Sequence, residues 1–131
     1  MQQKSEPRTI YGRQQSRPLS AAKRALLEKR LPDLLIKPHL EAKNTPESSF
    51  QEQNVNEVWL EIGFGGGEHL IAQAEANPDI GLIGCEPFLN GLANAVGAIE
   101  QKGLSNIRLH NGDAREILES LPSESISRIF L

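Results

Sequence analysis

The sequence predicts an α/β fold built on a parallel sheet. Short apolar runs alternate with stretches of helical period from residue 58 onward, and each run has the length of a buried strand. Strands that alternate with helices of this length pair in parallel through right-handed crossovers. A glycine-rich turn follows the first apolar run, as in α/β domains that bind a ligand between a strand and the next helix.

Residues 1–39 are predicted to form a basic arm and one helix. Ser20 is a suitable N-cap for a helix over residues 21–31, which Pro32 is expected to end. Residues 40–56 are polar and have no sustained period, so we predict a linker there.

Residues 57–131 are predicted to hold the α/β domain. Expected strands and helices alternate along it, with strands at 58–62, 79–86, 106–113 and 126–131 and helices at 67–77, 88–103 and 114–121. Gly103 is expected to end the longest helix, and the strand at 126–131 is expected to be buried. A doubly wound sheet normally has about six strands. Because the sequence stops in a fourth strand, we expect the chain to be the N-terminal part of a longer protein.

Composition excludes several classes of protein. Among 131 residues there is no apolar run of the roughly 20 that a membrane helix needs and no secretory signal, so we expect a cytoplasmic protein. The single cysteine, Cys85, excludes an internal disulfide, and its apolar surroundings favour a core residue over a nucleophile. The three histidines His39, His69 and His110 lack metal-like spacing, so no metal is expected.

The net charge of −3 is unevenly distributed. Residues 1–30 hold eight basic and two acidic side chains, a net charge of +6, and the rest of the chain carries −9. A basic arm on an acidic body suits a polyanion such as nucleic acid. A solvated tail that keeps the protein soluble would explain the charge equally well.

The glycine-rich turn, "EIGFGGGEHL", is compatible with only some ligands. A nucleoside triphosphate loop would need a lysine after Gly67, and a dinucleotide fingerprint would need a glycine where Glu68 stands. The pattern that fits is an acid followed by three alternate glycines: Glu61, Gly63, Gly65 and Gly67.

The acids that follow the strands indicate which ligand binds. Glu61 would repel a pyrophosphate, whereas S-adenosylmethionine offers a positive ammonium and a positive sulfonium. Glu86 could accept hydrogen bonds from ribose hydroxyls. Asp113 could accept the adenine amino group, while Ala114 offers its backbone N–H to the ring. Each acid alone could be a solvated strand end or a helix cap. Three acids after successive strands share one crevice, however, and we therefore predict an S-adenosylmethionine site.

Four segments carry a resemblance to a known family: "RTIYGRQQSRPLS", "VWLEIGFGGGEHL", "NPDIGLIGCEPFLNGLANAV" and "LSNIRLHNGDAREIL". They resemble the bacterial tRNA (guanine-N7-)-methyltransferases. The resemblance implies a Rossmann-like class I methyltransferase sheet, with S-adenosylmethionine as cofactor and guanine in the tRNA variable loop as substrate. It also implies that Glu61, Glu86 and Asp113 bind the cofactor.

The resemblance further implies how the arm and the catalytic residues are distributed. The arm would contact tRNA, with candidate contacts at Arg8, Arg13, Arg17, Lys23 and Arg24. The family's catalytic aspartate lies in a Pro-Asp-Pro-Trp segment that would follow Leu131. We therefore expect no catalytic residue within the chain and little activity from it alone. Separately, a monomer is expected. Two alternatives remain open: a methyltransferase acting on a small molecule or a protein, and a non-catalytic module that binds the cofactor.

Overall fold

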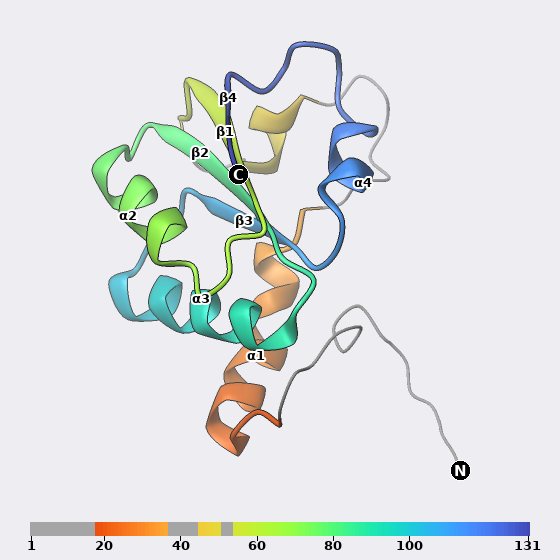
Figure 1. Cartoon of the computed structure of the whole chain (residues 1–131). Helices are drawn as coiled ribbons and strands as arrows, with labels where there is room; N and C mark the ends of the chain where they lie inside the picture. Colours follow the sequence, from red (N-terminus) through yellow and green to blue (C-terminus); the bar gives the residue numbers. More distant parts are fainter. Residues whose placement is uncertain (1–17, 37–44, 51–53) are drawn as a thin grey trace.

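The computed structural model describes residues 18–36, 45–50 and 54–131. Strands and helices alternate along the last of these ranges (Figure 1), which confirms the predicted α/β class. The elements are α1 (Ala21–Leu34), the short 3-10 helix η1 (Pro46–Phe50), β1 (Glu57–Ile62), α2 (Glu68–Ala76), β2 (Ile80–Cys85), α3 (Leu89–Lys102), β3 (Ile107–His110), α4 (Ala114–Leu118) and β4 (Arg128–Phe130).

The four strands form one parallel sheet in the order β3-β2-β1-β4. The chain runs outward from β1 through β2 to β3, and then returns through α4 to place β4 on the other side of β1. The order therefore reverses next to β1, and sheets of this kind bind ligands beyond the carboxyl ends of their strands at such a point. The β3 edge is extended by Leu35, which bridges to Leu109.

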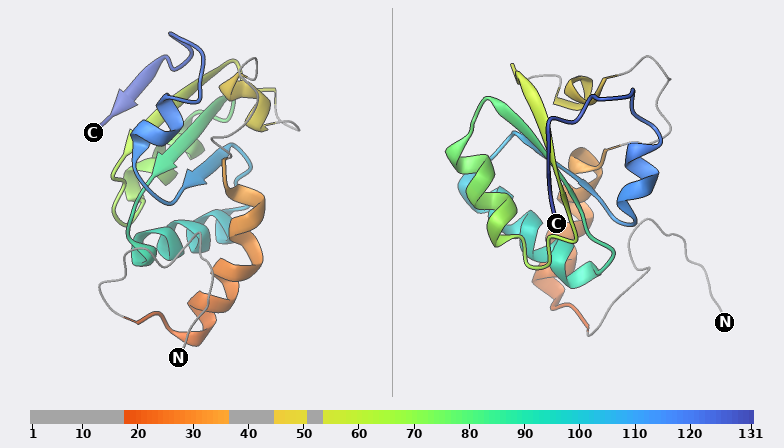
Figure 2. Two further views of the ribbon diagram at one scale, coloured as in Figure 1. Left: turned by 90° about the vertical axis from the view of Figure 1, so that its right-hand side faces the viewer. Right: turned by 45° about the horizontal axis from the view of Figure 1, so that its top comes forward.

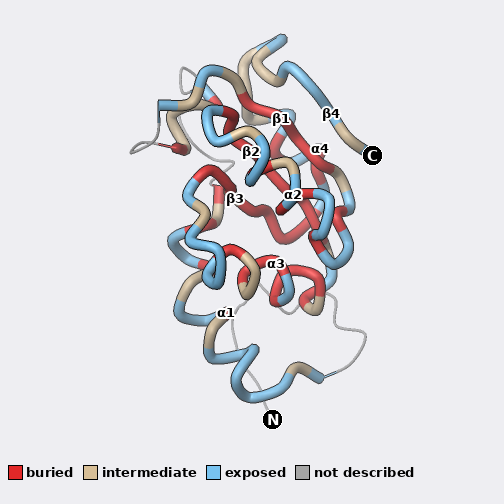
Figure 3. Tube along the Cα trace, turned by 90° about the vertical axis from the view of Figure 1, so that its left-hand side faces the viewer, coloured by how far each residue is buried: buried red, intermediate tan, exposed pale blue. Residues whose placement is uncertain are grey.

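Helices cover both faces of the sheet. Helices α2 and α3 lie on one face, and α4 and η1 lie on the other (Figures 1 and 2). Successive strand residues point to opposite faces, so Trp59 and Leu82 join the core with α2 and α3, whereas Leu60 and Ile83 join the core with η1 and α4. Figure 3 shows that β1, β2 and β3 are largely buried between these layers.

Helix α1 is longer than the sequence predicts. Its N-cap is the expected Ser20, whose side chain accepts a hydrogen bond from the backbone N–H of Lys23 at 3.2 Å. The predicted end at Pro32 is wrong, because the helix continues to Leu34 with the proline inside it. An interior proline costs a helix about 3 kcal/mol. Burial of Leu31 and Leu34 in the core shared with α3 offsets this cost.

Residues 45–50 pack against the sheet although they belong to the predicted linker at 40–56. The last residue of η1, Phe50, is fully buried in the core with α4. The guanidinium of Arg108 lies 5.0 Å from the Phe50 ring centroid, and its Nε donates to a carbonyl oxygen of η1 at 2.9 Å. A Cβ on Gly81 would lie 2.6 Å from the same ring. A single buried aromatic side chain thus fixes this segment, which its polar composition did not predict.

Strand β4 is exposed, whereas the sequence predicts a buried strand. Ile129 is 47% exposed and Leu131 is 98% exposed. The strand pairs with β1 and lies at the edge of the sheet that the described residues form. Its other side chains cover Trp59: the guanidinium of Arg128 lies 4.6 Å from the indole, and the ring of Phe130 meets it edge-on at 5.8 Å.

Candidate functional site

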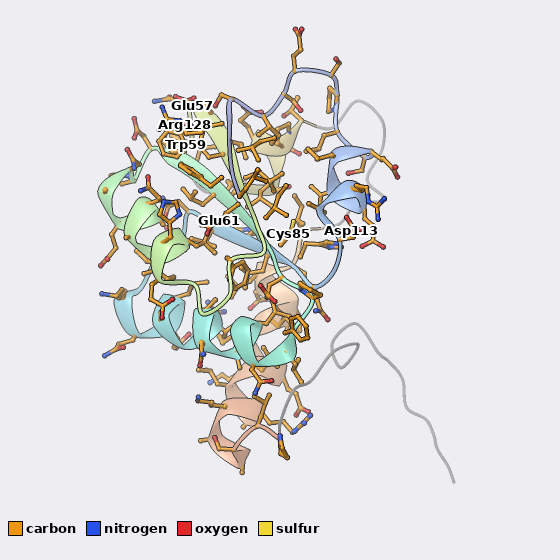
Figure 4. The ribbon with its side chains drawn as sticks, in the orientation of Figure 1. Glu57, Trp59, Glu61, Cys85, Asp113 and Arg128 are labelled. Carbon is orange, nitrogen blue, oxygen red and sulfur yellow. The ribbon has the colours of Figure 1, made fainter. Side chains whose placement is uncertain are left out.

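The structure brings the three predicted acids to one end of the sheet. Glu61 is the last residue but one of β1, Glu86 directly follows β2, and Asp113 lies three residues beyond β3. The backbone N–H of Glu86 donates to the carbonyl oxygen of His110 at 3.0 Å, which aligns the ends of β2 and β3. Figure 4 shows Glu61 and Asp113 toward this end, with Glu57 at the opposite end of β1. The predicted placement is present, and the binding roles of the acids stay a prediction.

Each predicted glycine adopts a backbone conformation that other residues rarely reach. The φ angles of Gly63, Gly65 and Gly67 are 66°, 62° and 91°. A Cβ on Gly63 or Gly65 would meet nothing within 4 Å, so glycine is needed here for its backbone conformation rather than for lack of space. The N–H of Gly63 donates to the carbonyl oxygen of Cys85 at 2.8 Å, which ties the loop to β2. The loop is therefore rigidly specified and open to a ligand.

Glu86 holds this loop in place. Its buried carboxylate accepts hydrogen bonds from the N–H of Gly65 at 2.8 Å and from the N–H of Phe88 at 3.1 Å. These bonds join the glycine loop to the turn before α3. Each carboxylate oxygen has two acceptor sites, so each keeps one site for a further donor, such as the ribose hydroxyls predicted to bind here.

Glu61 is a buried carboxylate beside the loop. The residue is only 7% exposed. Its Oε1 lies 2.9 Å from Nδ1 of His69 in the first turn of α2, while Oε2 has no hydrogen-bond partner among the described residues. Burying a carboxylate is costly unless its charge is compensated. The second oxygen is therefore suited to a ligand group that donates hydrogen bonds or carries positive charge.

Asp113 is the N-cap of α4, the role that the sequence left open beside cofactor binding. Its Oδ1 accepts the backbone N–H of Arg115 at 2.8 Å, and its Oδ2 lies 2.6 Å from the guanidinium of the same residue. The Arg115 guanidinium, followed by this backbone bond, lowers the pKa of Asp113 to about 2, so the carboxyl is ionised at neutral pH. Ala114 begins the helix and is buried. The sequence did not predict the contact with Arg115.

Two residues of the site were missed by sequence analysis. Gly91 lies in α3, and a Cβ there would lie 2.2 Å from the carbonyl oxygen of Gly65 and 3.1 Å from Cγ of Glu86. An isolated glycine inside a helical pattern is a sign of close packing, which could have identified it. His69 was considered only as a metal ligand. No sequence pattern pairs it with Glu61, because the pairing depends on the path of the glycine turn.

Cys85 is a core residue, as the sequence predicts. It is almost completely buried at the end of β2. Burial is the main cause that raises the pKa of its thiol to about 12, and the negative charges of Asp113 and Glu116 add to the effect. The thiol is therefore protonated at neutral pH and unsuited to act as a nucleophile.

The described part of the chain holds neither a cluster of metal-ligating side chains nor a helix suited to a membrane. No group of three or more metal-ligating side chains gathers within residues 18–36, 45–50 and 54–131. His110 instead lies 2.6 Å from Glu116 through its Nε2, and His39 lies outside the described residues. None of the helices in these ranges is long and apolar enough to cross a membrane.

The candidate tRNA contacts are only partly described. Lys23 and Arg24 are exposed near the N-terminus of α1, and Nζ of Lys23 donates to Oδ1 of Asn94 on α3 at 3.2 Å. The other three candidates lie outside the described residues: Arg8, Arg13 and Arg17.

Comparison with known proteins gives a family match over the α/β domain. The model of a family described as putative methyltransferases matches residues 55–131. The matched range begins just before β1 and contains the glycine loop and the three acids at the strand ends.

Curated relatives match more of the chain. A tRNA (guanine-N(7)-)-methyltransferase of Caulobacter sp. (strain K31) is 44% identical over 134 residues, which cover 99% of this chain and 55% of the relative. A protein of the same name from Rhodospirillum rubrum is 41% identical over 97% of this chain and 51% of the relative. One from Ruegeria sp. (strain TM1040) is 52% identical over 85 residues, which cover 65% of this chain and 32% of the relative. The chain thus spans about half the length of the curated relatives it matches, and these matches confirm the resemblance.

Proposed function

Because the chain belongs to the methyltransferase family whose model covers residues 55–131, we propose that it carries the cofactor-binding residues of a tRNA (guanine-N7-)-methyltransferase. The observation that carries this proposal is the extent of the similarity. Relatives of that name match 97–99% of the chain, and so include the segment that precedes the family match. A general methyltransferase resemblance would be confined to the cofactor-binding domain.

We propose S-adenosylmethionine as the cofactor, and the residues at the strand ends fit it. The partly unpaired carboxylate of Glu61 suits the cationic aminoacyl end of this molecule and would repel a pyrophosphate. Glu86 would accept hydrogen bonds from the ribose hydroxyls. Asp113 and the backbone N–H of Ala114 would bind adenine. When bound, the cofactor supplies an electrophilic methyl group. The open glycine loop lets the backbone approach it closely.

The proposed reaction asks little acid–base chemistry of the protein. Guanine N7 carries a lone pair at neutral pH, so no general base is needed to create the nucleophile. The protein contributes by holding both reactants close and aligned and by excluding water. The buried thiol of Cys85, the one cysteine of the chain, is protonated, and a reaction of this kind does not need it as a base or a nucleophile.

We propose tRNA as the partner of the basic N-terminal segment. Phosphate contacts from arginine and lysine would give an affinity that is salt-dependent and largely independent of sequence. The exposed Lys23 and Arg24 on α1 support this proposal together with the net charge of +6 in residues 1–30. The guanine would lie in the variable loop, and we expect a monomer that works in the cytoplasm.

The proposal is tested with the protein expressed from its complete reading frame. We expect it to form 7-methylguanosine when incubated with S-adenosylmethionine and unmodified tRNA, measured by mass spectrometry of the digested RNA. If tRNA stays free of 7-methylguanosine while the protein still binds S-adenosylmethionine, the substrate is wrong and the cofactor is right.

Removal of residues 1–17 separates this function from methylation of a small molecule or a protein. If the arm binds tRNA phosphates, the deletion should raise KM for tRNA and weaken the salt dependence of binding, because basic contacts are lost. Unchanged tRNA turnover would favour the reading of the arm as a solubility tail.

A further inference from the structure

The carboxylate of Glu61 and the imidazole of His69 meet across the glycine loop. Nδ1 of His69 lies 2.9 Å from Oε1 of Glu61. Glu61 is the last residue but one of β1, and His69 is the second residue of α2. The contact therefore joins β1 and α2, the two elements that the glycine loop connects.

The chemistry of the two groups fixes the direction of the bond. An ionised carboxylate only accepts hydrogen bonds, so Nδ1 of His69 carries the hydrogen and donates it. The Glu61 side chain is 10% exposed and that of His69 is 47% exposed. The buried member of the pair is thus the carboxylate, and among the described residues His69 is its hydrogen-bond partner.

A second contact restrains the imidazole. The ring of Phe130 meets it edge-on, with ring centroids 4.7 Å apart and planes at 71°. Phe130 also packs edge-on against Trp59. Edge-to-face contacts of this kind are favourable for aromatic rings. The imidazole is therefore restrained by the carboxylate and by Phe130 of β4, whose ring packs in turn against Trp59 of β1.

We propose that His69 is a positioning residue for the aminoacyl end of S-adenosylmethionine. By binding Oε1 it fixes the rotamer of Glu61 and leaves Oε2 to face the positive groups of the cofactor. A positioned carboxylate binds a cation better than one that must be ordered when the ligand arrives. This inference rests on the proposed function, since it takes Glu61 as the group that binds the donor.

The test compares three ligands whose aminoacyl ends differ. S-adenosylmethionine and S-adenosylhomocysteine carry the ammonium group, and the first also carries the sulfonium. Methylthioadenosine keeps the adenine and the ribose but has neither cationic group. A role in positioning Glu61 affects the first two ligands alone, whereas a general loss of structure affects all three.

The variants are His69→Ala, which removes the donor, and His69→Asn, whose amide nitrogen can donate from a position close to that of Nδ1. For His69→Ala we expect affinity for S-adenosylmethionine and S-adenosylhomocysteine to fall about five- to tenfold, the net contribution of one typical hydrogen bond. Affinity for methylthioadenosine should stay within about twofold, because this ligand has no cationic group for Glu61 to bind. His69→Asn should restore most of the loss. Ligand-observed NMR titration measures all three affinities, and thermal melting checks the folding of each variant.

The outcomes separate this inference from the proposed function. If His69→Ala binds S-adenosylmethionine as the wild type does, if all three affinities fall together, or if His69→Asn is no better than His69→Ala, the positioning role is wrong. If the wild type fails to bind S-adenosylmethionine, or Glu61→Gln binds it unchanged, the proposed cofactor site itself is wrong.

Discussion

Glu61→Gln is expected to lower the affinity for S-adenosylmethionine about 100-fold, or about 3 kcal/mol, the range seen when one member of a buried charge pair is removed. Glutamine keeps the volume of the side chain and can still accept the hydrogen bond from His69. The substitution therefore removes the negative charge and replaces the acceptor at Oε2 by an amide donor, which cannot bind a cation. Because the residue is only 7% exposed, water screens this charge weakly. Isothermal calorimetry on the variant and the wild type measures the difference.

A matched control lies at the other end of the same strand. Glu57 is a half-buried acid whose carboxylate accepts hydrogen bonds from Ser127 and from the indole N–H of Trp59. It lies away from the glycine loop (Figure 4). Glu57→Gln should therefore leave the affinity unchanged within about twofold, because this charge lies at the far end of β1 and is partly screened by water. Equal affinities for Glu61→Gln and Glu57→Gln would mean that Glu61 does not face a cation.

Gly91→Ala is expected to disturb both stability and cofactor binding. A Cβ at this position would lie 2.2 Å from the carbonyl oxygen of Gly65, closer than nonbonded atoms can approach. Backbone must move to relieve the clash, and overpacking of this kind costs about 1–3 kcal/mol. The displaced atoms belong to the glycine loop and to Glu86, so we also expect affinity for S-adenosylmethionine to fall by more than about tenfold. Chemical denaturation and calorimetry measure the two effects.

Gly97→Ala is the control for this variant. Gly97 lies in the same helix, α3, and a Cβ there would meet nothing within 4 Å. Alanine is preferred over glycine inside helices by about 0.5–1 kcal/mol. We therefore expect Gly97→Ala to be slightly more stable than the wild type and to bind the cofactor normally. If the two variants behaved alike, the close packing of α3 on the glycine loop would be wrong.

Much of the fold follows from local rules that act on the sequence. Apolar runs of strand length and helices of regular period alternate after residue 56, and this alternation leaves a parallel sheet as the simplest solution. In such a sheet the carboxyl ends of all strands lie at the same end of the sheet. The placement of Glu61, Glu86 and Asp113 was predictable for that reason, although the acids are far apart in the sequence.

Features that depend on long-range packing were not predictable. Phe50 anchors a polar segment because Gly81 leaves space for its ring on a distant strand. Helix α1 passes through Pro32 because Leu31 and Leu34, on either side of the proline, are buried against another element. Strand β4 is exposed because it is the edge strand of the sheet that the described residues form, and no local pattern predicts the position of a strand in a sheet. The contact between Glu61 and His69 likewise arises only once the glycine turn has brought α2 back over β1.

A titration of the isotope-labelled chain followed by amide NMR tests most directly whether the glycine loop binds a cationic methyl donor rather than a phosphate. S-adenosylmethionine and NAD⁺ would be added separately at equal concentrations. We predict that S-adenosylmethionine shifts the amides of Gly63, Gly65, Gly67, Glu86 and Ala114, while NAD⁺ leaves them in place. Larger shifts of these amides with NAD⁺, or shifts with S-adenosylmethionine confined to other parts of the chain, would contradict the account.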